Sequence, residues 1–212
     1  MKIVLFGASG RIGQRIAREA LDRGHEVTAV VRDPSRMPLT HERLTTVKGD
    51  ARVADDVAHV AAGHDIVASA IGPSPDQPLE APSEAARALI AGTRRAGVLR
   101  LIVVGGGGSL EAPSGQAVLD TPEFPAAWRP GALAQRDALE VYRAEAALDW
   151  TYLSPPMFIE PGERTGHYRA GGEQLVVDAH GSSRISMEDF AIAFVDEIEA
   201  RKHARRRFTV AY

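Results

Sequence analysis

The chain has 212 residues, a formal net charge of −3 and 44% hydrophobic residues, so it is long enough to fold as one domain around a sizeable core. Acidic and basic residues are mixed along the sequence, which argues against a broad nucleic-acid-binding face. There is no cysteine, so disulfides, thiolate zinc sites and cysteine nucleophiles are excluded.

Short apolar segments alternate with longer amphipathic segments, as in proteins whose parallel sheet is covered by helices. Strands are predicted at 2–6, 26–32, 44–49, 65–72, 100–105, 149–154 and 208–212. Helices are predicted to begin near Arg11, Val53, Ser83, Leu133 and Met187. Because parallel neighbours need helical crossovers, this order predicts an α/β fold with a Rossmann-like, doubly wound parallel sheet.

One domain is predicted over residues 1–212, with a core over about 1–155 and a small C-terminal substrate-side cap over about 156–212. The stretch from Gly105 to about Pro130 is long for a connection and holds four prolines. A long loop beside a strand end is often a functional lid, and an extended surface loop is the alternative.

The N-terminal segment MKIVLFGASG has a short apolar run that stops at a glycine, so neither a signal peptide nor a membrane span is expected. The basic run at 201–207 suits the end of a helix, with a nucleic-acid patch as the alternative. We expect a soluble cytoplasmic protein with a small-molecule substrate and no nucleic-acid or membrane partner. Both a monomer and a homodimer fit this size.

The first predicted strand is followed directly by GASGRIG, with glycines in G-x-x-G-x-x-G spacing at the start of a helix. Glycine lets the backbone approach a pyrophosphate, and the unpaired N–H groups of a helix start bind it. Strand, turn and helix context makes this motif more specific than a lone glycine pattern. The residues expected to contact a dinucleotide are Gly7, Ala8, Ser9, Gly10, Arg11, Ile12 and Gly13.

The second predicted strand ends at Arg32, and Asp33 and Arg36 follow. An acid at this place binds the ribose hydroxyls of NAD, whereas an arginine favours the 2′-phosphate of NADP. Since guanidinium forks match phosphate oxygens, we predict a clamp by Arg32 and Arg36 and favour NADP(H) over NAD(H). The alternative is that Asp33 caps the turn before Pro34 and both arginines are solvated.

Ligands of open parallel sheets lie at the carboxyl ends of the strands. The later strand ends are therefore expected to complete the cofactor groove, with two residues at the adenine and the others toward the nicotinamide. These residues are Asp50 and Ala51, then Ala70, Ile71, Gly72, Gly105, Gly106, Ser154 and Pro155.

The segments GASGRIG, VVRDPSRM, VKGDA, AIG, LDWTYLSPP, TGHY and SRISMEDFA, in this order, resemble the atypical short-chain dehydrogenase/reductases. Within that group the chain is similar to the NAD(P)H-binding NmrA-like and flavin reductase (biliverdin reductase B)-like proteins. The resemblance runs along nearly the whole chain. It implies an NADP-type Rossmann fold, oxidoreductase activity and a small substrate-binding end.

Two departures from this resemblance concern the chemistry. The wider family uses a Tyr-x-x-x-Lys pair whose tyrosine is the acid, but alignment on LDWTY places Ala132 and Arg136 there. Arg136 is a candidate contact for the nicotinamide ribose or a substrate anion, with a solvent-facing arginine as the alternative. The flavin-reductase-like proteins use a serine and a histidine where this chain has Gly106 and Met157.

The segment VVGGGGSLEA, residues 103–112, leaves Ser109 as a candidate catalytic contact if its glycines fold the loop back. Because the pyrophosphate already has a loop at 7–13, the glycines at 105–108 are predicted to form a floor for nicotinamide and acceptor. The seven histidines show no paired metal spacing, and no G-x-S-x-G elbow is present, so neither a metal site nor a hydrolase triad is predicted.

The sequence therefore favours an NADP(H)-dependent oxidoreductase that moves hydride between the nicotinamide and a small planar or carbonyl acceptor, such as a flavin or quinone. An NADP(H)-binding redox sensor without turnover is the alternative, favoured by the missing tyrosine. An epimerase or dehydratase is a weaker alternative, since those enzymes usually keep the Tyr and Lys.

Overall fold

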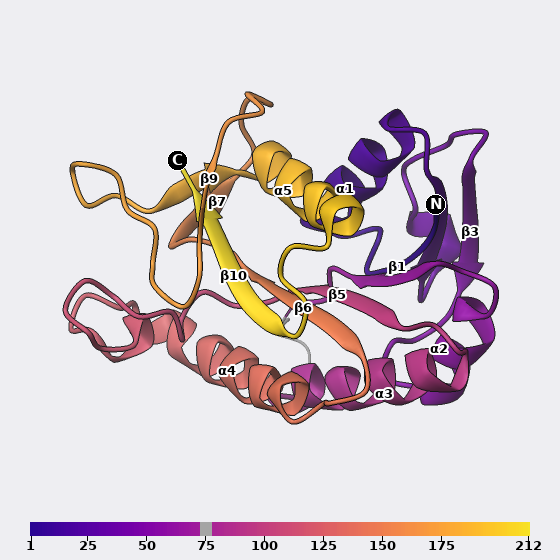
Figure 1. The fold of residues 1–212 in the computed structure, drawn as a ribbon, viewed down its shortest axis with the longest axis horizontal. Helices are drawn as coiled ribbons and strands as arrows, with labels where there is room; N and C mark the ends of the chain where they lie inside the picture. Colours follow the sequence, from indigo (N-terminus) through magenta and orange to yellow (C-terminus); the bar gives the residue numbers. More distant parts are fainter. Residues whose placement is uncertain (73–77) are drawn as a thin grey trace.

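The computed structural model describes residues 1–72 and 78–212, and its centre is one sheet in the order β3-β2-β1-β4-β5-β6-β10-β8 (Figure 1). All neighbours pair in parallel except β8, which runs antiparallel to β10. The strands are β1 (Lys2–Phe6), β2 (Glu26–Val31), β3 (Leu44–Lys48), β4 (Ile66–Ser69), β5 (Arg100–Val104), β6 (Asp149–Ser154), β8 (Arg169–Gly171) and β10 (Arg206–Ala211). The predicted doubly wound parallel sheet is confirmed.

Helices cover both faces of this sheet (Figure 1). One face carries α1 (Arg11–Asp22) and α5 (Met187–Ala200), which pack against each other. The opposite face carries α2 (Ala54–Ala61), α3 (Ala81–Arg95) and α4 (Arg129–Arg143) in a row. Three short 3₁₀ helices also occur in the described chain: η1 (Pro34–Arg36), η2 (Val118–Asp120) and η3 (Ala126–Trp128).

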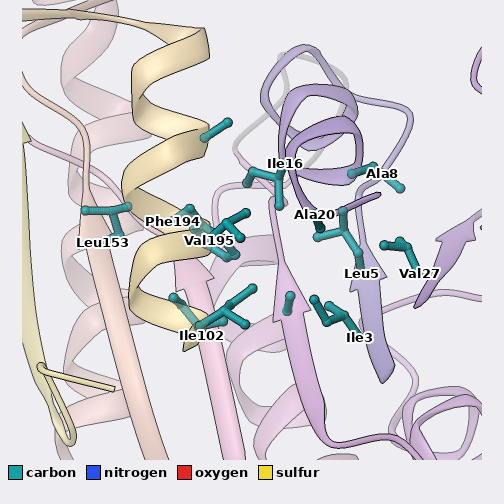
Figure 2. Packing of buried hydrophobic residues seen from close by; sticks show 14 of the residues in the cluster. Ile3, Leu5, Ala8, Ile16, Ala20, Val27, Ile102, Leu153, Phe194 and Val195 are labelled. Carbon is teal, nitrogen blue, oxygen red and sulfur yellow. The ribbon is translucent and has the colours of Figure 1, made fainter. Parts of the chain in front are cut away.

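The alternation of side chains along each strand builds two apolar layers. In β1, Ile3 and Leu5 face α1 and α5, whereas Val4 and Phe6 face the other three helices. Figure 2 shows side chains of α1 and α5, Ile16 and Phe194 among them, reaching into the first layer. Burial on both faces explains why the central strands read as solid apolar runs.

The C-terminal part differs in extent from the predicted cap. Helix α5 packs beside α1, and β10 lies inside the main sheet, so these elements belong to the body of the domain. A separate small sheet remains, formed by parallel pairing of β7 (Phe158–Glu160) with β9 (Arg184–Ser186). Of the region predicted as a cap, only this two-stranded sheet and its loops lie outside the body of the domain.

The long segment after β5 is irregular, as predicted, but it is packed. Leu110, Val118 and Leu119 are buried, and an isolated bridge joins Glu111 to Ala117. Helix α4 begins at Arg129 instead of near Leu133, because a proline in the first helical turn gives up an N–H that has no helical partner. The segment therefore buries apolar side chains of its own.

Candidate cofactor site

The turn between β1 and α1 forms one wall of the site. Gly7 has φ +75°, and a Cβ on Gly13 would lie 2.1 Å from the Gly7 carbonyl oxygen, so only glycine lets the helix start this close to the turn. Gly10 caps α1 without any side-chain hydrogen bond, and the first turn of α1 holds no acid. The free N–H groups and the positive end of the helix are thus available to an anion.

A cavity of about 210 Å³ opens beside this turn, at the carboxyl ends of β1, β2, β3 and β4. Strands β1 and β4 are neighbours whose connections leave toward opposite sides of the sheet (Figure 1), and such a switch point is where doubly wound folds bind ligands. The lining residues are Phe6, Gly7, Ser9, Gly10, Val30, Val31, Arg32, Gly49, Asp50, Ala51, Arg52, Ala70, Ile71, Gly72 and Ala81.

Charged side chains gather where β2 and β3 end. Arg32 is exposed at the end of β2 and lines the cavity. Asp50 follows β3 and forms a two-pronged ion pair with Arg52, with Nε to Oδ1 at 3.2 Å and Nη2 to Oδ2 at 2.7 Å. These bonds from Arg52 hold the pKa of Asp50 below its ordinary value. Within the described part of the chain, the lining thus carries two guanidinium groups and one carboxylate.

Asp33, the acid that follows β2, forms its hydrogen bonds within its own turn. Asp33 accepts hydrogen bonds from the backbone N of Ser35 at 3.1 Å and from Ser35 Oγ at 2.7 Å, and these bonds lower the pKa of Asp33. This side chain therefore caps η1, as the alternative interpretation predicted. Arg36 lies in η1 and does not line the cavity, so the structure brings Arg32 to the groove without its predicted companion.

The predicted cofactor residues, taken together, divide into those that line the cavity and those that do not. Nine of those named from the sequence line the cavity, among them Ser9, Ala51 and Ile71. Ala8 is not in the lining because it is buried in the core, and Arg11 is exposed. Ile12 packs against the apolar layer between the sheet and helices α1 and α5. Gly105, Gly106, Ser154 and Pro155 belong to the ends of β5 and β6 and do not line this cavity.

The space beside the glycines that follow β5 is filled by side chains of the protein itself. A Cβ on Gly105 would lie 1.8 Å from a ring carbon of Tyr152. The backbone N of Gly106 donates to the Tyr152 hydroxyl at 3.0 Å, and that hydroxyl donates to the carbonyl oxygen of Gln135 at 3.0 Å. Burial raises the pKa of Tyr152 to about 12, so the ring stays neutral and fixes this turn.

Ser109 has a specific partner on the last strand. The buried Arg207 of β10 donates from Nη1 to Ser109 Oγ at 2.8 Å and also pairs with Glu173. Arg207 Nε is buried without a partner among the described residues. Ser154, also fully buried, has an unpaired hydroxyl within the same described part of the chain. Ser109 is therefore oriented by a cation that lies 98 positions later in the sequence.

The place of the family's tyrosine and lysine lies on α4. Ala132 stands close to the turn after β5, since a Cβ on Gly108 would lie 2.8 Å from the Ala132 Cβ. Arg136, one turn later, is exposed and pairs with the neighbouring Asp137, Nη2 to Oδ1 at 3.2 Å. The structure therefore does not bring Arg136 to Ser109 or to the cavity lining.

Sequence reasoning missed Arg52 and the connection between Ser109 and Arg207. Arg52 was the next residue after the predicted pair Asp50 and Ala51, so its position beside the strand end was a usable signal.

Over residues 1–72 and 78–212, no helix is long and apolar enough to cross a membrane. Within the same ranges no group of three or more metal-binding side chains occurs.

Comparisons with known proteins give the chain a family. Residues 7–198 match the model of a family described as NAD(P)H-binding. The uncharacterised protein YwnB of Bacillus subtilis (strain 168) is 40% identical, over 99% of this chain and 98% of its own.

Among the solved structures that align with the whole of this chain, two illustrate the similarity. One, from Burkholderia pseudomallei, is described as a candidate exported protein and is 46% identical, with a TM-score of 0.91 and 100% of its own chain covered. The other, from Streptococcus pneumoniae TIGR4, is described as a candidate NADH-flavin reductase and is 34% identical, with a TM-score of 0.86 and 99% of its own chain covered. The protein belongs to the family of NAD(P)H-binding proteins whose model matches residues 7–198.

Proposed function

We propose that the protein is an NADPH-dependent reductase that passes hydride to a small planar or carbonyl-bearing acceptor, such as a flavin or a quinone. The supporting observation is the cavity at the switch point of the sheet. Its β1–α1 wall offers free N–H groups suited to a pyrophosphate, and its β2 end offers Arg32, which suits a 2′-phosphate better than a hydroxyl pair.

The acceptor class follows from the side chains on α4. When bound, the reduced nicotinamide supplies the hydride, so the protein has mainly to hold donor and acceptor together. Ala132 carries no acidic group, and the guanidinium of Arg136 stays charged and is a poor proton donor. A reduced flavin or quinone takes its proton from water, whereas a simple ketone needs an acid nearby. The description of the Streptococcus relative supports the same class.

Ser109 is our candidate polar contact to the acceptor. Its Oγ accepts a hydrogen bond from Arg207, so the hydroxyl hydrogen remains free to donate to an acceptor oxygen or nitrogen. A buried guanidinium behind the hydroxyl makes that donation stronger. Arg136, the other candidate from the sequence, is left out of this proposal, because its guanidinium is exposed and pairs with Asp137.

The experiment follows the absorbance of NADPH and NADH with a panel of flavins, quinones and aldehydes, beside equilibrium titrations of both cofactors. We expect oxidation of NADPH by at least one flavin or quinone, with slower turnover of aldehydes. Tight NADPH binding with no oxidation by any member of the panel would reject the reductase proposal for these acceptors.

That same result would support the second candidate, a redox sensor that binds NADP(H) without turnover. The observation in its favour is the pair Ala132 and Arg136 in place of tyrosine and lysine. The same pair makes an epimerase or dehydratase a weaker candidate, since those enzymes usually keep the tyrosine and lysine. A cytoplasmic location and assembly as a monomer or homodimer stay predictions, which fractionation and light scattering would test.

A further inference from the structure

We propose that Arg52 is the second phosphate-binding residue of the cofactor site and, with Arg32, sets the preference for NADPH over NADH. The proposal deepens the proposed function, on whose cofactor it rests. It replaces Arg36, the companion that the sequence predicted for Arg32, with a residue from the end of a different strand.

The position of Arg52 joins it to Arg32. The two strands that precede them, β2 and β3, are parallel neighbours in the sheet, so their carboxyl ends lie side by side. Both arginines line the same cavity, together with Asp50 between them in the chain. Arg36, in contrast, lies in η1 outside the lining.

The guanidinium of Arg52 is held in place but only partly used. Its fork to Asp50 takes two N–H groups, from Nε and Nη2. A guanidinium has five such groups, so three remain for a ligand. The backbone N of Arg52 also donates to Asp50 Oδ1 at 3.0 Å, which fixes the start of the side chain. A cation positioned in advance loses less conformational entropy when it binds a phosphate.

The charges of the wall favour an anion. Asp50 alone would repel a phosphate, but its carboxylate is neutralised by Arg52, and Arg32 lies near enough to help lower the pKa of Asp50. Arg32 has no ion-pair partner among the described residues. Among the described residues of the lining, two guanidiniums against one carboxylate leave one net positive charge. A 2′-phosphate supplies the matching negative charge, whereas the ribose hydroxyl of NADH does not.

The test measures equilibrium dissociation constants of NADPH and NADH for Arg52→Ala, Arg32→Ala and Arg36→Ala. Adenosine 2′,5′-bisphosphate and AMP serve as probes that lack the nicotinamide. Arg36→Ala is the matched control, because it removes an exposed arginine from the same region but off the cavity. Arg52→Lys keeps the charge without the planar fork.

We expect Arg52→Ala to weaken NADPH and the bisphosphate about tenfold, the usual effect of losing a hydrogen bond to a charged group. NADH and AMP should change less than about twofold, as should every ligand with Arg36→Ala, and Arg52→Lys should fall in between. Thermal unfolding checks that the variants fold, which is expected because the ion pair is half-exposed.

Equal losses of NADPH and NADH in Arg52→Ala would overturn the proposal, since they would mean that Arg52 contacts the adenine or the shared phosphates. No loss of either ligand would overturn it too. If the wild type shows no NADPH preference and Arg32→Ala has no selective effect, the cofactor assignment itself fails. These constants do not depend on any acceptor, so a failure of the acceptor panel would be seen separately.

Discussion

The chain has two glycine-rich turns at the carboxyl edge of its sheet, and the two turns differ in what occupies the space beside them. In the turn after β1, Gly7 and Gly10 line an open cavity beside a helix start that has no side-chain cap. In the turn after β5, the space in front of Gly105 is filled by the ring of Tyr152, whose hydroxyl holds the backbone N of Gly106. The first turn leaves room for a ligand, and the second leaves room for a side chain of the protein itself.

The difference shows that a glycine run has no fixed meaning in a sequence. Both runs follow a buried strand, and both contain positions where a Cβ would collide with its surroundings. What separates them is the partner in the collision: backbone of the same turn for Gly13, and an aromatic ring from β6 for Gly105. Ligand binding is expected to respond to changes in the first run and folding stability to changes in the second.

The largest effect is expected for Gly105→Ala. The new Cβ would overlap the Tyr152 ring, and overpacking of this kind lowers the free energy of unfolding by about 3 kcal/mol. Chemical denaturation measures the loss. Gly172→Ala, whose Cβ would meet nothing within 4 Å, is the control, and equal losses in the two variants would contradict the packing argument. Adding Tyr152→Leu to Gly105→Ala should recover part of the loss, because the changes are coupled.

The next effect concerns Arg207. Replacing this buried cation by methionine keeps its bulk but removes its bonds to Ser109 and Glu173, which we expect to cost about 2 kcal/mol of unfolding free energy. Ser109→Ala should cost less than about 1 kcal/mol. Its value lies in kinetics: a lower kcat/KM for the acceptor with an unchanged Kd for NADPH is expected if Ser109 contacts the acceptor. Unchanged turnover would remove Ser109 from the chemistry.

Gly10→Ala tests the open turn. Its Cβ would lie 3.2 Å from the Gly7 carbonyl oxygen, on a residue that lines the cavity. We expect NADPH and NADH to be weakened alike, by about tenfold or 1.4 kcal/mol, because both carry the pyrophosphate. The free energy of unfolding should change by less than about 1 kcal/mol. Titration measures the affinities and denaturation measures the stability. A loss of stability without a loss of affinity would contradict the distinction between a ligand-binding turn and a structural turn.

The smallest effect is a pH dependence at Asp50. The pKa of this carboxyl is depressed in the folded chain, so its contribution is present above the unfolded pKa of about 3.9 and is lost as the pH falls through the lower folded value. A half-exposed pair is worth about 0–1 kcal/mol. Asp50→Asn should therefore be slightly less stable than wild type at neutral pH, and the gap should close below about pH 4. A constant gap would assign the effect to packing.

Periodicity was enough to predict the main layers of the fold. The seven predicted strands and five helices are present, because buried parallel strands and amphipathic helices leave distinct patterns. The short strands β7, β8 and β9 have three residues each, too few for a pattern. Their existence depends on pairing partners elsewhere, such as β10 for β8, and no local signal specifies that pairing.

The candidate site divides in the same way. The β1–α1 turn and Arg32 could be found because each sits at a fixed distance from its strand. Arg36 has similar spacing, yet Asp33 folds the chain into η1 and leaves Arg36 outside the cavity. The link between Ser109 and Arg207 could not be found, since it depends on where β10 enters the sheet. Local spacing predicts a strand end, but tertiary pairing decides which side chains meet there.

The position of β10 has a consequence for the order of events during synthesis. This strand inserts between β6 and β8, and its Arg207 holds the loop that follows β5. A ribosome makes about 5–20 residues per second, so that loop waits several seconds, from the appearance of Ser109 to that of residues 206–211, before it can take its final form. The β1–α1 turn, whose contacts come from β1 and β4, can be complete long before then.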